Sequence, residues 1–217
     1  MKIDKDSHGT IAKVCLSSLL IAGLSLWLIP IWAVSIPIAS VFFFLACFTV
    51  YFHRVPVRNI VGSDKIVSSV ADGKVVILEK AFENEYLKRE CIQVSIYMDF
   101  FDVHANFWPL TGKVTYYKYH PGKYLLAFKP KASEENEHSS TAIKSQYGEI
   151  FFKQIAGTFA RRIVCYSKEG AEEVAGQQCG IIKFGSRIDI FLPLDAKIKV
   201  KKGDFTRACE TVIAELA

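Results

Sequence analysis

The segment Ile182-Lys-Phe-Gly-Ser-Arg-Ile-Asp-Ile-Phe-Leu-Pro193 alternates apolar and polar residues in the way that a β-strand does. Its centre, however, is the pair Gly185-Ser186. Glycine weakens the interior of a strand, and serine adds no apolar surface to a core. The pair therefore marks either a β-bulge, which is the simpler interpretation of the residues alone, or a place where the backbone has a chemical task.

Short apolar runs separated by glycine turns fill most of the chain before and after this segment. Residues 65–78 contain two such runs around Asp72-Gly73, and we predict a hairpin there. A second hairpin is predicted where residues 112–119 and 123–128 flank His120-Pro121-Gly122.

Two further segments complete this pattern. Residues 132–148 are polar and predict a loop, whereas residues 149–166 fit either a strand or a helix. Many short strands with glycine turns are typical of a mainly β domain, and we predict a compact β-sandwich or barrel-like fold.

The N-terminal part of the chain has a different composition, because Val14 to Phe52 contains no charged residue and no histidine. A single helix of that length would be about 60 Å long, twice the ~30 Å thickness of a hydrocarbon core. Two spanning helices fit better, with Pro30 and Pro37 offering places for a break. We predict an N-terminus at 1–13, a membrane hairpin of two apolar helices at 14–52 and one soluble domain at 53–217.

The charges that flank this apolar block predict its orientation. Basic residues lie on both sides of it, whereas the turn near Pro30 has none; they are Lys2, Lys5, Lys13, Arg54, Arg58 and Lys65. By the positive-inside rule, both ends and the following domain lie on the cytoplasmic side of the cell membrane. A cleaved signal peptide is a poor alternative, because its apolar stretch has only about 7–15 residues.

The overall charge and the cysteines exclude several functional classes. The net charge of +5 suits an anionic membrane surface and gives no strong indication of nucleic-acid binding. None of the six cysteines forms a C-x-x-C pair, so neither a zinc site nor a disulfide framework is predicted.

A Gly-Ser peptide bond has a specific chemical liability. Glycine leaves its carbonyl carbon open, and a serine oxygen held against that carbon can attack it, which converts the amide to an ester. Elimination at the serine then breaks the chain, and hydrolysis leaves an N-terminal pyruvoyl group. This reaction needs a base near the serine and hydrogen-bond donors for the oxyanion.

The context of Gly185-Ser186 resembles the phosphatidylserine decarboxylase family, whose members are pyruvoyl enzymes made as self-cleaving proenzymes. The resemblance covers nearly the whole chain and is closest to the short form with an N-terminal membrane segment. Six pieces in family order carry it: SVADGKV (69–75), FFDVHANFWPLTGKV (100–114), YHPGKYLLAFKPKASEENE (119–137), QIAGTFARRIV (154–164), GIIKFGSRIDIFLP (180–193) and VKKGDFTRACETVIAEL (200–216).

Two departures from the family pattern are visible. The family often has Arg-Asp-Pro after the membrane block, where this chain has Arg54-Val55-Pro56. Family members have an arginine or a second histidine after His-x-Asn, where this chain has Phe107-Trp108. Whatever that arginine or histidine does in other members must be done differently here.

The resemblance implies cleavage between Gly185 and Ser186 into a larger chain, 1–185, and a small chain, 186–217, headed by a pyruvoyl group made from Ser186. Asp72 and His104 become the candidate acid-base pair. The implied reaction converts membrane phosphatidylserine to phosphatidylethanolamine and CO2 through a Schiff base, without a metal or pyridoxal phosphate. The two chains stay together; nucleic acid is not a partner, and the sequence leaves both a monomer and a homo-oligomer open.

Each of these residues also has a simpler interpretation. Asp72 before glycine is typical of a turn, and His104 among phenylalanines is typical of a core. Arg161-Arg162 fits a site for the lipid phosphate or an exposed surface pair. Phe107-Trp108 fits core packing better than the membrane interface. Glu134-Glu135-Asn136 predicts a solvated loop, with a lid over the site as the alternative.

A non-enzymatic membrane-anchored adaptor is the rival function. Residues 200–216 resemble the turn-and-strand unit of lipoyl and biotinyl carrier domains, and we expect the decarboxylase family to share that architecture. The turn Lys202-Gly203-Asp204 lacks the modifiable lysine that carrier domains place after methionine or aspartate. An adaptor would stay one uncleaved chain of 24.4 kDa.

Overall fold

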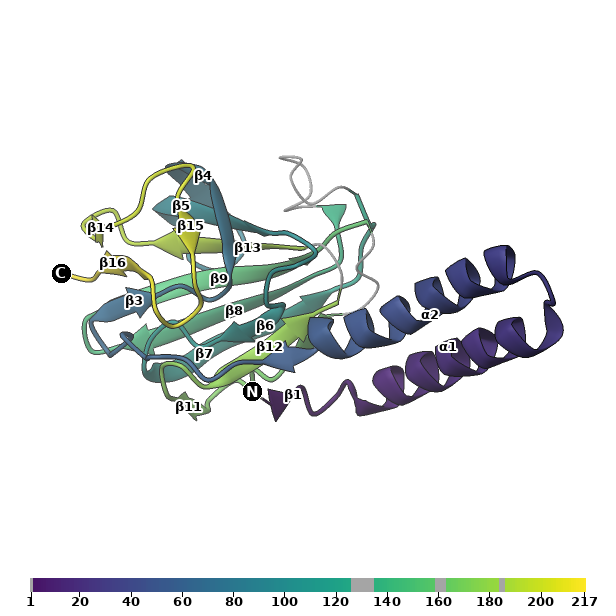
Figure 1. Ribbon diagram of the computed structural model, residues 1–217. Coiled ribbons are helices and arrows are strands. Elements are labelled where there is room, and N and C mark those ends of the chain that lie inside the picture. The colour runs from purple at the N-terminus through teal and green to yellow at the C-terminus, as the bar shows by residue number, and fades with distance from the viewer. Residues whose placement is uncertain (1, 126–134, 159–162, 184–185) are drawn as a thin grey trace. The chain divides into compact units, whose positions relative to one another are not determined.

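The computed structural model describes residues 2–125, 135–158, 163–183 and 186–217. The chain divides into two compact units, Met1–Val57 and Arg58–Ala217 (Figure 1). The first unit contains the helices, and the elements described in the second unit are strands.

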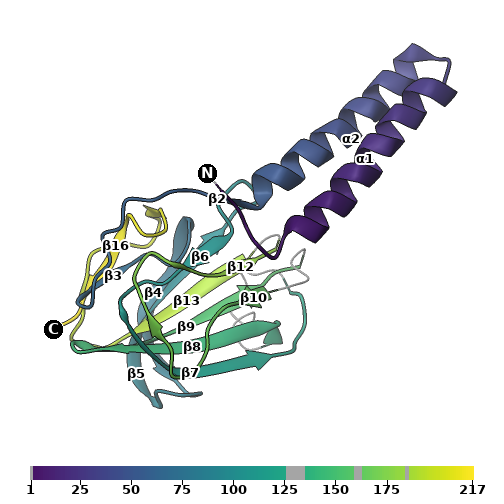
Figure 2. The same ribbon diagram turned by 90° about the horizontal axis from the view of Figure 1, so that it is seen from below.

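The first unit is a pair of apolar helices, α1 (His8–Leu28) and α2 (Trp32–Phe52), which lie side by side (Figure 2). Pro30 lies in the short link between them, and Pro37 lies inside α2. Both helices are long and apolar enough to cross a membrane. The predicted helical hairpin is therefore confirmed, although α1 begins at His8 rather than at Val14.

The ends of the helical hairpin are joined by a short two-stranded sheet. Strand β1 (Lys2–Ile3) pairs with β2 (Arg54–Val55), so the residues before α1 lie beside those after α2. The guanidinium of Arg54 lies 3.6 Å from the centre of the Tyr51 ring. Large apolar side chains along both helices are exposed, among them Leu20, Trp27 and Phe44.

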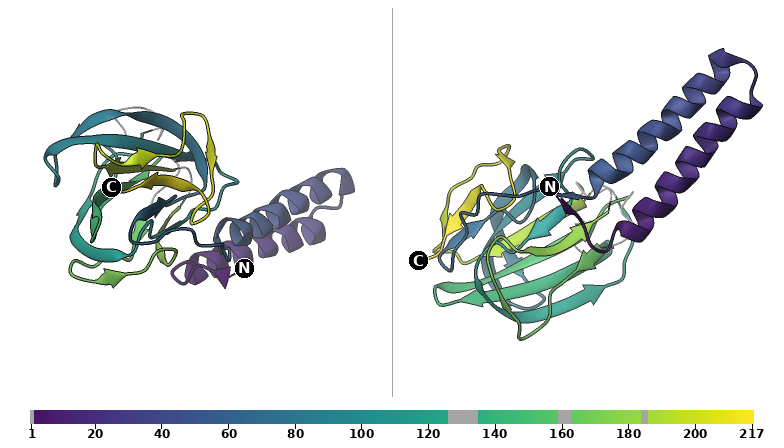
Figure 3. Two further views of the ribbon diagram at one scale, coloured as in Figure 1. Left: turned by 90° about the vertical axis from the view of Figure 1, so that its left-hand side faces the viewer. Right: turned by 60° about the horizontal axis from the view of Figure 1, so that its bottom comes forward.

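The described strands of the second unit form three sheets and pair with one another in antiparallel fashion. The largest sheet has the order β11-β7-β8-β9-β13-β5-β4-β15, and the smaller ones are β10-β12-β6 and β14-β16-β3 (Figure 1). The large sheet curls around the core (Figure 3). The strands are β3 (Ile66–Ser68), β4 (Gly73–Glu83), β5 (Arg89–Met98), β6 (Ala105–Phe107), β7 (Gly112–His120), β8 (His138–Ser145), β9 (Gly148–Ala156), β10 (Ile163–Cys165), β11 (Glu172–Glu173), β12 (Gln178–Ile182), β13 (Ser186–Leu192), β14 (Lys197–Ile198), β15 (Phe205–Thr206) and β16 (Val212–Glu215).

Strand β13 lies in the middle of the large sheet, between β9 and β5, and both of its faces are buried. One face, here called the core face, carries Ser186 and the apolar residues Ile188, Ile190 and Leu192, which join the main hydrophobic core with residues of all three sheets. The other, here called the back face, carries Arg187, Asp189 and Phe191 and is covered by a smaller cluster. The alternation at 186–192 that predicted a strand thus separates two different interiors.

Neither predicted hairpin is formed by the described residues, and residues 126–128 of the second one lie outside them. Strand β3 pairs with β16, whereas β4 pairs with β5, so residues 65–78 pass from one sheet to another rather than folding back. Gly73, at the crossing, has φ +148°, and a side chain there would overlap the carbonyl oxygen of Tyr97. Glycine is therefore required at this position for a close approach of two strands rather than for a hairpin turn.

The second predicted hairpin and the predicted polar loop are corrected together. Strand β7 pairs with β8, which lies inside the segment 132–148, and not with residues 123–125. The polar side chains of β8 make buried hydrogen bonds, such as Ser139 to Gln154 and Thr141 to Ser167. The ambiguous segment 149–166 contains strand β9, and the mainly β prediction is confirmed.

Candidate active site

Ser186 is the first residue of β13 and lies where the chain crosses between two sheets. It follows strand β12, which belongs to a three-stranded sheet, by only three residues, and its partners in the large sheet are Met98 and Ala156. Its side chain is fully buried, and its Oγ has no hydrogen-bond partner among the described residues. A buried hydroxyl without a partner is unusual and calls for an explanation. Gly185, the other residue of the expected cleavage site, lies outside the described residues.

His104 lies beside the segment that leads to Ser186. Its backbone oxygen accepts a hydrogen bond of 3.2 Å from the Ile182 amide, and its side chain is fully buried. The ring Nδ1 lies 3.1 Å from the backbone oxygen of Asp102. Because a carbonyl oxygen can only accept, Nδ1 carries the proton and Nε2 is the basic nitrogen of the neutral ring.

Asp72 lies at the same end of the large sheet as Ser186. It precedes β4, and the register aligns Lys74 of that strand with Tyr97, which is opposite Arg187. Its carboxylate accepts hydrogen bonds of 2.6 Å from Arg58 and 2.8 Å from the Ala208 amide. Its direct participation with His104 and Ser186 stays a prediction.

The contacts of Arg58 correct one expectation from the sequence. The side chain is 6% exposed and forms ion pairs with Asp72 at 2.6 Å and Glu210 at 3.7 Å. As one of the basic residues that flank the apolar block, Arg58 is expected from the sequence, like Arg54, to lie near the phosphates of the lipid surface. A buried arginine that is already paired with two carboxylates fixes Asp72 rather than presenting charge to a membrane surface.

A chain of three uncharged polar side chains lies on the core face near Ser186. Ser139 donates to Oε1 of Gln154 at 2.8 Å, and Nε2 of Gln154 donates to Oδ1 of Asn106 at 2.8 Å. All three residues are at most 1% exposed. Sequence reasoning missed them as a group, although Asn106 belongs to the quoted His-x-Asn motif, because they come from three separate strands.

The other candidate residues divide into structural residues and residues outside the described part of the chain. Phe107 and Trp108 are buried in the core, as core packing predicts. Arg161, Arg162 and Glu134 lie outside the described residues.

The two remaining residues of the predicted solvated loop have partners. Glu135 forms an ion pair with Lys123 at 3.0 Å. Asn136 is 1% exposed, and its amide donates to the backbone oxygens of Leu125 and Ala156. The prediction of a solvated segment is therefore wrong for Asn136, which ties β9 to the residues that follow β7.

The back face of the sheet holds a cluster of charged and polar groups around Glu85, a residue at the tip of the β4–β5 hairpin. Its carboxylate accepts hydrogen bonds or ion pairs from Tyr116, His120, Ser140 and Lys153, at distances between 2.7 and 3.2 Å. Burial by itself would raise the pKa of Glu85, but Lys153 and the other donors outweigh it and lower the pKa to about 2.

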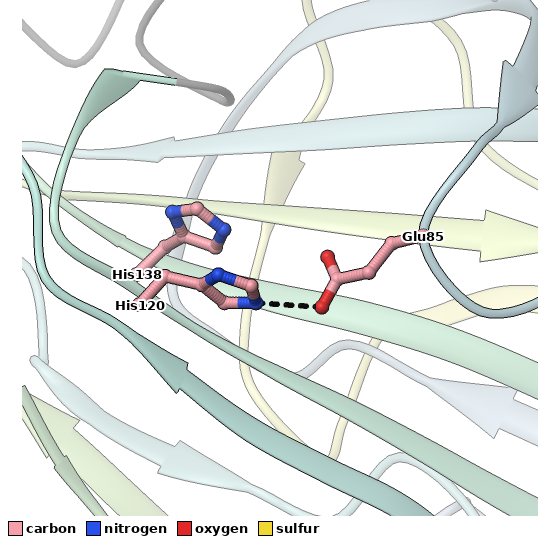
Figure 4. A group of neighbouring side chains, drawn as sticks. All are labelled: Glu85, His120 and His138. Atoms are coloured by element: carbon pink, nitrogen blue, oxygen red, sulfur yellow. Dashed lines mark hydrogen bonds and ion pairs between the residues drawn. The ribbon is translucent and has the colours of Figure 1, made fainter.

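Figure 4 shows His120 and His138 stacked next to this carboxylate. One nitrogen of each ring and one oxygen of Glu85 lie within 4.8 Å of one another, which raises the question of a metal site. The rings are nearly parallel, with centroids 4.3 Å apart, whereas an ion must lie in the plane of each ring that binds it. With the Lys153 ammonium also 2.8 Å from the carboxylate, the geometry fits an ion cluster better than a metal centre.

Comparisons with known proteins agree with the motifs quoted above. Residues 45–214 match the model of the family described as phosphatidylserine decarboxylase. Proteins named phosphatidylserine decarboxylase proenzyme are similar to this chain: that of Amoebophilus asiaticus is 48% identical over 80% of this chain and 77% of its own length, and that of Porphyromonas gingivalis is 39% identical over 100% and 99%. That of Cytophaga hutchinsonii is 47% identical over 76% of this chain and 75% of its own length. The motif order, the family match over most of the chain and these relatives lead to one conclusion: the chain belongs to the phosphatidylserine decarboxylase family.

Proposed function

We propose that this protein is a proenzyme that cleaves itself between Gly185 and Ser186 and then decarboxylates phosphatidylserine to phosphatidylethanolamine. The observation that carries the proposal is the buried, unpartnered Oγ of Ser186 at the start of β13, in a chain of this family. If Ser186 were only part of a β-bulge, its buried hydroxyl would be expected to have a hydrogen-bond partner.

The cleavage step begins with Ser186 and a base. His104 Nε2 accepts the hydroxyl proton while Oγ attacks the carbonyl carbon of Gly185; the C–N bond then breaks, leaving an ester and a free amine. Removal of the Ser186 Cα proton breaks the C–O bond, so that the larger chain leaves with a carboxylate end. One water then replaces the amine nitrogen, which departs as ammonia.

Asp72 has an electrostatic part in this proposal. Its charge is held by Arg58 and the Ala208 amide at the same end of the sheet, where it favours a protonated His104. The arginine fixes the position of this carboxylate through their ion pair of 2.6 Å.

The buried place of Ser186 fits a pyruvoyl group, because the methyl group that replaces the serine side chain is smaller than it and the keto oxygen takes the place of the backbone nitrogen, so that no new cavity is required. When formed, that group supplies an electrophilic carbonyl that binds the headgroup amine and takes up the electron pair left by departing CO2. The residues of the chain do the rest. The pairing of β13 with β5 and β9 holds the strand behind the new N-terminus in place, and His104 returns a proton to Cα of the substrate.

The two apolar helices are compatible with membrane association. We further propose that the second unit lies on the cytoplasmic side, where basic residues flank the apolar block. A substrate whose acyl chains stay in the bilayer then meets the enzyme on the membrane surface. The adaptor alternative is not favoured, because the family match covers residues 45–214, including both the His104 and the Ser186 motifs.

The decisive experiment is the intact mass of the purified wild type and of Ser186→Ala. The wild type is expected as two chains, 1–185 and 186–217, with a blocked, keto-bearing N-terminus on the smaller one. Ser186→Ala is expected as one inactive chain. A wild type that remains intact and still decarboxylates would refute the proposal, and one that is intact and inert would favour the adaptor.

The role of the helices is tested separately by deleting residues 1–50. Self-cleavage is internal to the second unit and is expected to be spared. Turnover of phosphatidylserine in vesicles is expected to fall much more than turnover of a short-chain soluble analogue. Equal activity on both substrates in the truncated and full chains would show that the helices are not needed for access to the substrate.

A further inference from the structure

The amide group of Asn106 has a donor that the fold does not use fully. Asn106 is fully buried, and its Oδ1 is held by Gln154 at 2.8 Å. Among the described residues, the acceptor for its Nδ2 group is the sulfur of Met98, at 3.8 Å. A thioether is a weak acceptor, and an amide has two N–H donors to satisfy. Buried amide donors normally have better partners.

The position of this donor relates it to Ser186. Met98 is the residue directly opposite Ser186 in the β5–β13 pair, and both side chains lie on the core face. Asn106, two residues after His104, lies on β6, and β6 pairs with β12, the strand that precedes Ser186 in the chain. The underused amide and the unpartnered hydroxyl are therefore brought to the same end of the core face by strands from two different sheets.

We propose that Asn106 is a catalytic residue of self-cleavage, whose Nδ2 group donates to the oxyanion formed when Ser186 Oγ attacks the preceding carbonyl. This inference rests on the proposed cleavage at Ser186 and adds the donor that such a reaction requires. In the attack, the C–O bond forms and the carbonyl electron pair moves to its oxygen. That oxygen then carries the negative charge until the C–N bond breaks and the pair returns.

Gln154 and Ser139 have positioning roles in this arrangement. Gln154 fixes the oxygen of the Asn106 amide, and so directs its nitrogen away from Gln154 and toward Met98. Ser139, in turn, orients Gln154 from β8. A donor that is held in place before the reaction costs no reorganisation when the charge appears, which is the property of an effective oxyanion site.

The test measures the rate of cleavage of newly made protein by pulse-chase in cell-free translation with detergent. Asn106→Leu keeps the approximate shape of the side chain and removes the donor; we expect a loss on the order of 10²–10³ in rate. Gln154→Ala keeps the Nδ2 donor of Asn106 but no longer fixes its orientation. We expect a loss on the order of tenfold in cleavage rate, because one ordinary hydrogen bond contributes about that factor. Thr141→Val is the matched control, because it removes a buried hydrogen bond on the same face, to Ser167, at a position opposite Phe152 rather than near Ser186.

Two further measurements separate a catalytic role from a structural one. Each substitution is combined with Ser186→Ala, so that the melting temperature of the uncleaved chain reports folding alone. Hydroxylamine, which cleaves an ester, is added to the slow proenzymes. We expect Asn106→Leu to give no rapid hydroxylamine cleavage, because the ester has not formed, and to lower the rate equally at all pH values.

The outcomes are distinct for the two proposals. If the wild type is not cleaved at 185–186, the proposed function fails. If the wild type is cleaved and Asn106→Leu is cleaved as fast, only the role of Asn106 fails. Rapid hydroxylamine cleavage of Asn106→Leu would also overturn that role, because it would place the block after ester formation. A loss of rate that matches a loss of melting temperature in both Asn106→Leu and Thr141→Val would show a structural effect only.

Discussion

The two faces of β13 treat their polar groups in opposite ways. On the back face, the fully buried Arg187 contacts both oxygens of Asp189, at 2.8 and 2.9 Å, and the second contact is also a well-directed hydrogen bond. On the core face, one residue earlier, the hydroxyl of Ser186 has no partner among the described residues. A buried charge without partners would be too costly to keep, whereas a neutral hydroxyl can be left unpaired at a modest cost.

The two faces of this one strand therefore have different roles: the back face stabilises the fold, and the core face carries the reactive groups. The charges behind the sheet are paired and hold the strands together, and the same holds for Glu85 with its four donors. The uncharged groups in front of it, Ser186 and Asn106, are the ones with donors or acceptors to spare. Catalytic sites are expected where buried polar groups lack some of their hydrogen-bond partners.

The largest expected effect comes from breaking the back-face ion pair. Asp189→Asn replaces a charged partner of the buried Arg187 by a neutral one, and removal of one charge of such a pair is expected to cost about 3–5 kcal/mol. Urea unfolding in a Ser186→Ala background measures this on a single chain. The double substitution Arg187→Met with Asp189→Leu is the control and is expected to recover most of the stability. Slow cleavage in Asp189→Asn with unchanged stability would contradict the structural role.

A smaller, pH-dependent effect is expected from Glu85. Its pKa in the folded chain, about 2, lies below its ordinary value of 4.5, so the folded state favours the ionised carboxylate. The resulting stability is present above pH 4.5 and is lost as the pH falls from 4.5 toward 2, to an extent of about 3 kcal/mol at most.

Unfolding of the uncleaved Ser186→Ala chain between pH 6 and 3 checks this expectation. Glu85→Gln is the matched control, since it retains the shape and loses the titrating group. The slope of stability against pH should be shallower in Glu85→Gln than in the parent. Equal slopes would show that Lys153 and His120 do not hold the charge of Glu85 in solution.

The smallest effect concerns the two ends of the β4–β5 pair. Phe101, 66% exposed, lies in the turn between Met98 and His104, whereas Phe82, 62% exposed, lies near the other end of the pair, opposite Glu90. If the site opens to the bilayer, Phe101→Ala should lower turnover of phosphatidylserine in vesicles by a few-fold. Full burial of a phenylalanine side chain in lipid contributes about 2 kcal/mol, and the substitution removes the part of this free energy that Phe101 gains at the membrane surface. Phe82→Ala should leave it unchanged.

Both phenylalanine variants should cleave themselves normally and turn over a short-chain soluble analogue like the wild type. An equal loss in the two variants would indicate a general effect of surface apolarity, and no loss in either would place the membrane-facing surface elsewhere.

The sequence by itself determined the elements whose signals are local. A charge-free run from Val14 to Phe52 exceeds one membrane thickness, so two apolar helices follow from length and composition. The alternation after Ser186 predicted a strand, and the ordered motifs around Gly185-Ser186 indicated the family. These features depend on neighbours in the chain, and therefore they are readable without a fold.

Only the tertiary structure decided which strands pair and which polar groups are buried. The segments around Gly73 and His120 looked like hairpins because apolar runs flank turn residues, yet their partners are β16, β5 and β8. The polar segment 132–148 looked like a loop because of its composition, yet three residues of β8 within it make hydrogen bonds to distant residues: Ser139 to Gln154, Ser140 to Glu85 and Thr141 to Ser167. Asn106 meets Gln154 across 48 residues, and Arg58 meets Glu210 from nearly the opposite end of the unit. Contacts of this kind depend on the register of distant strands, which no local pattern specifies.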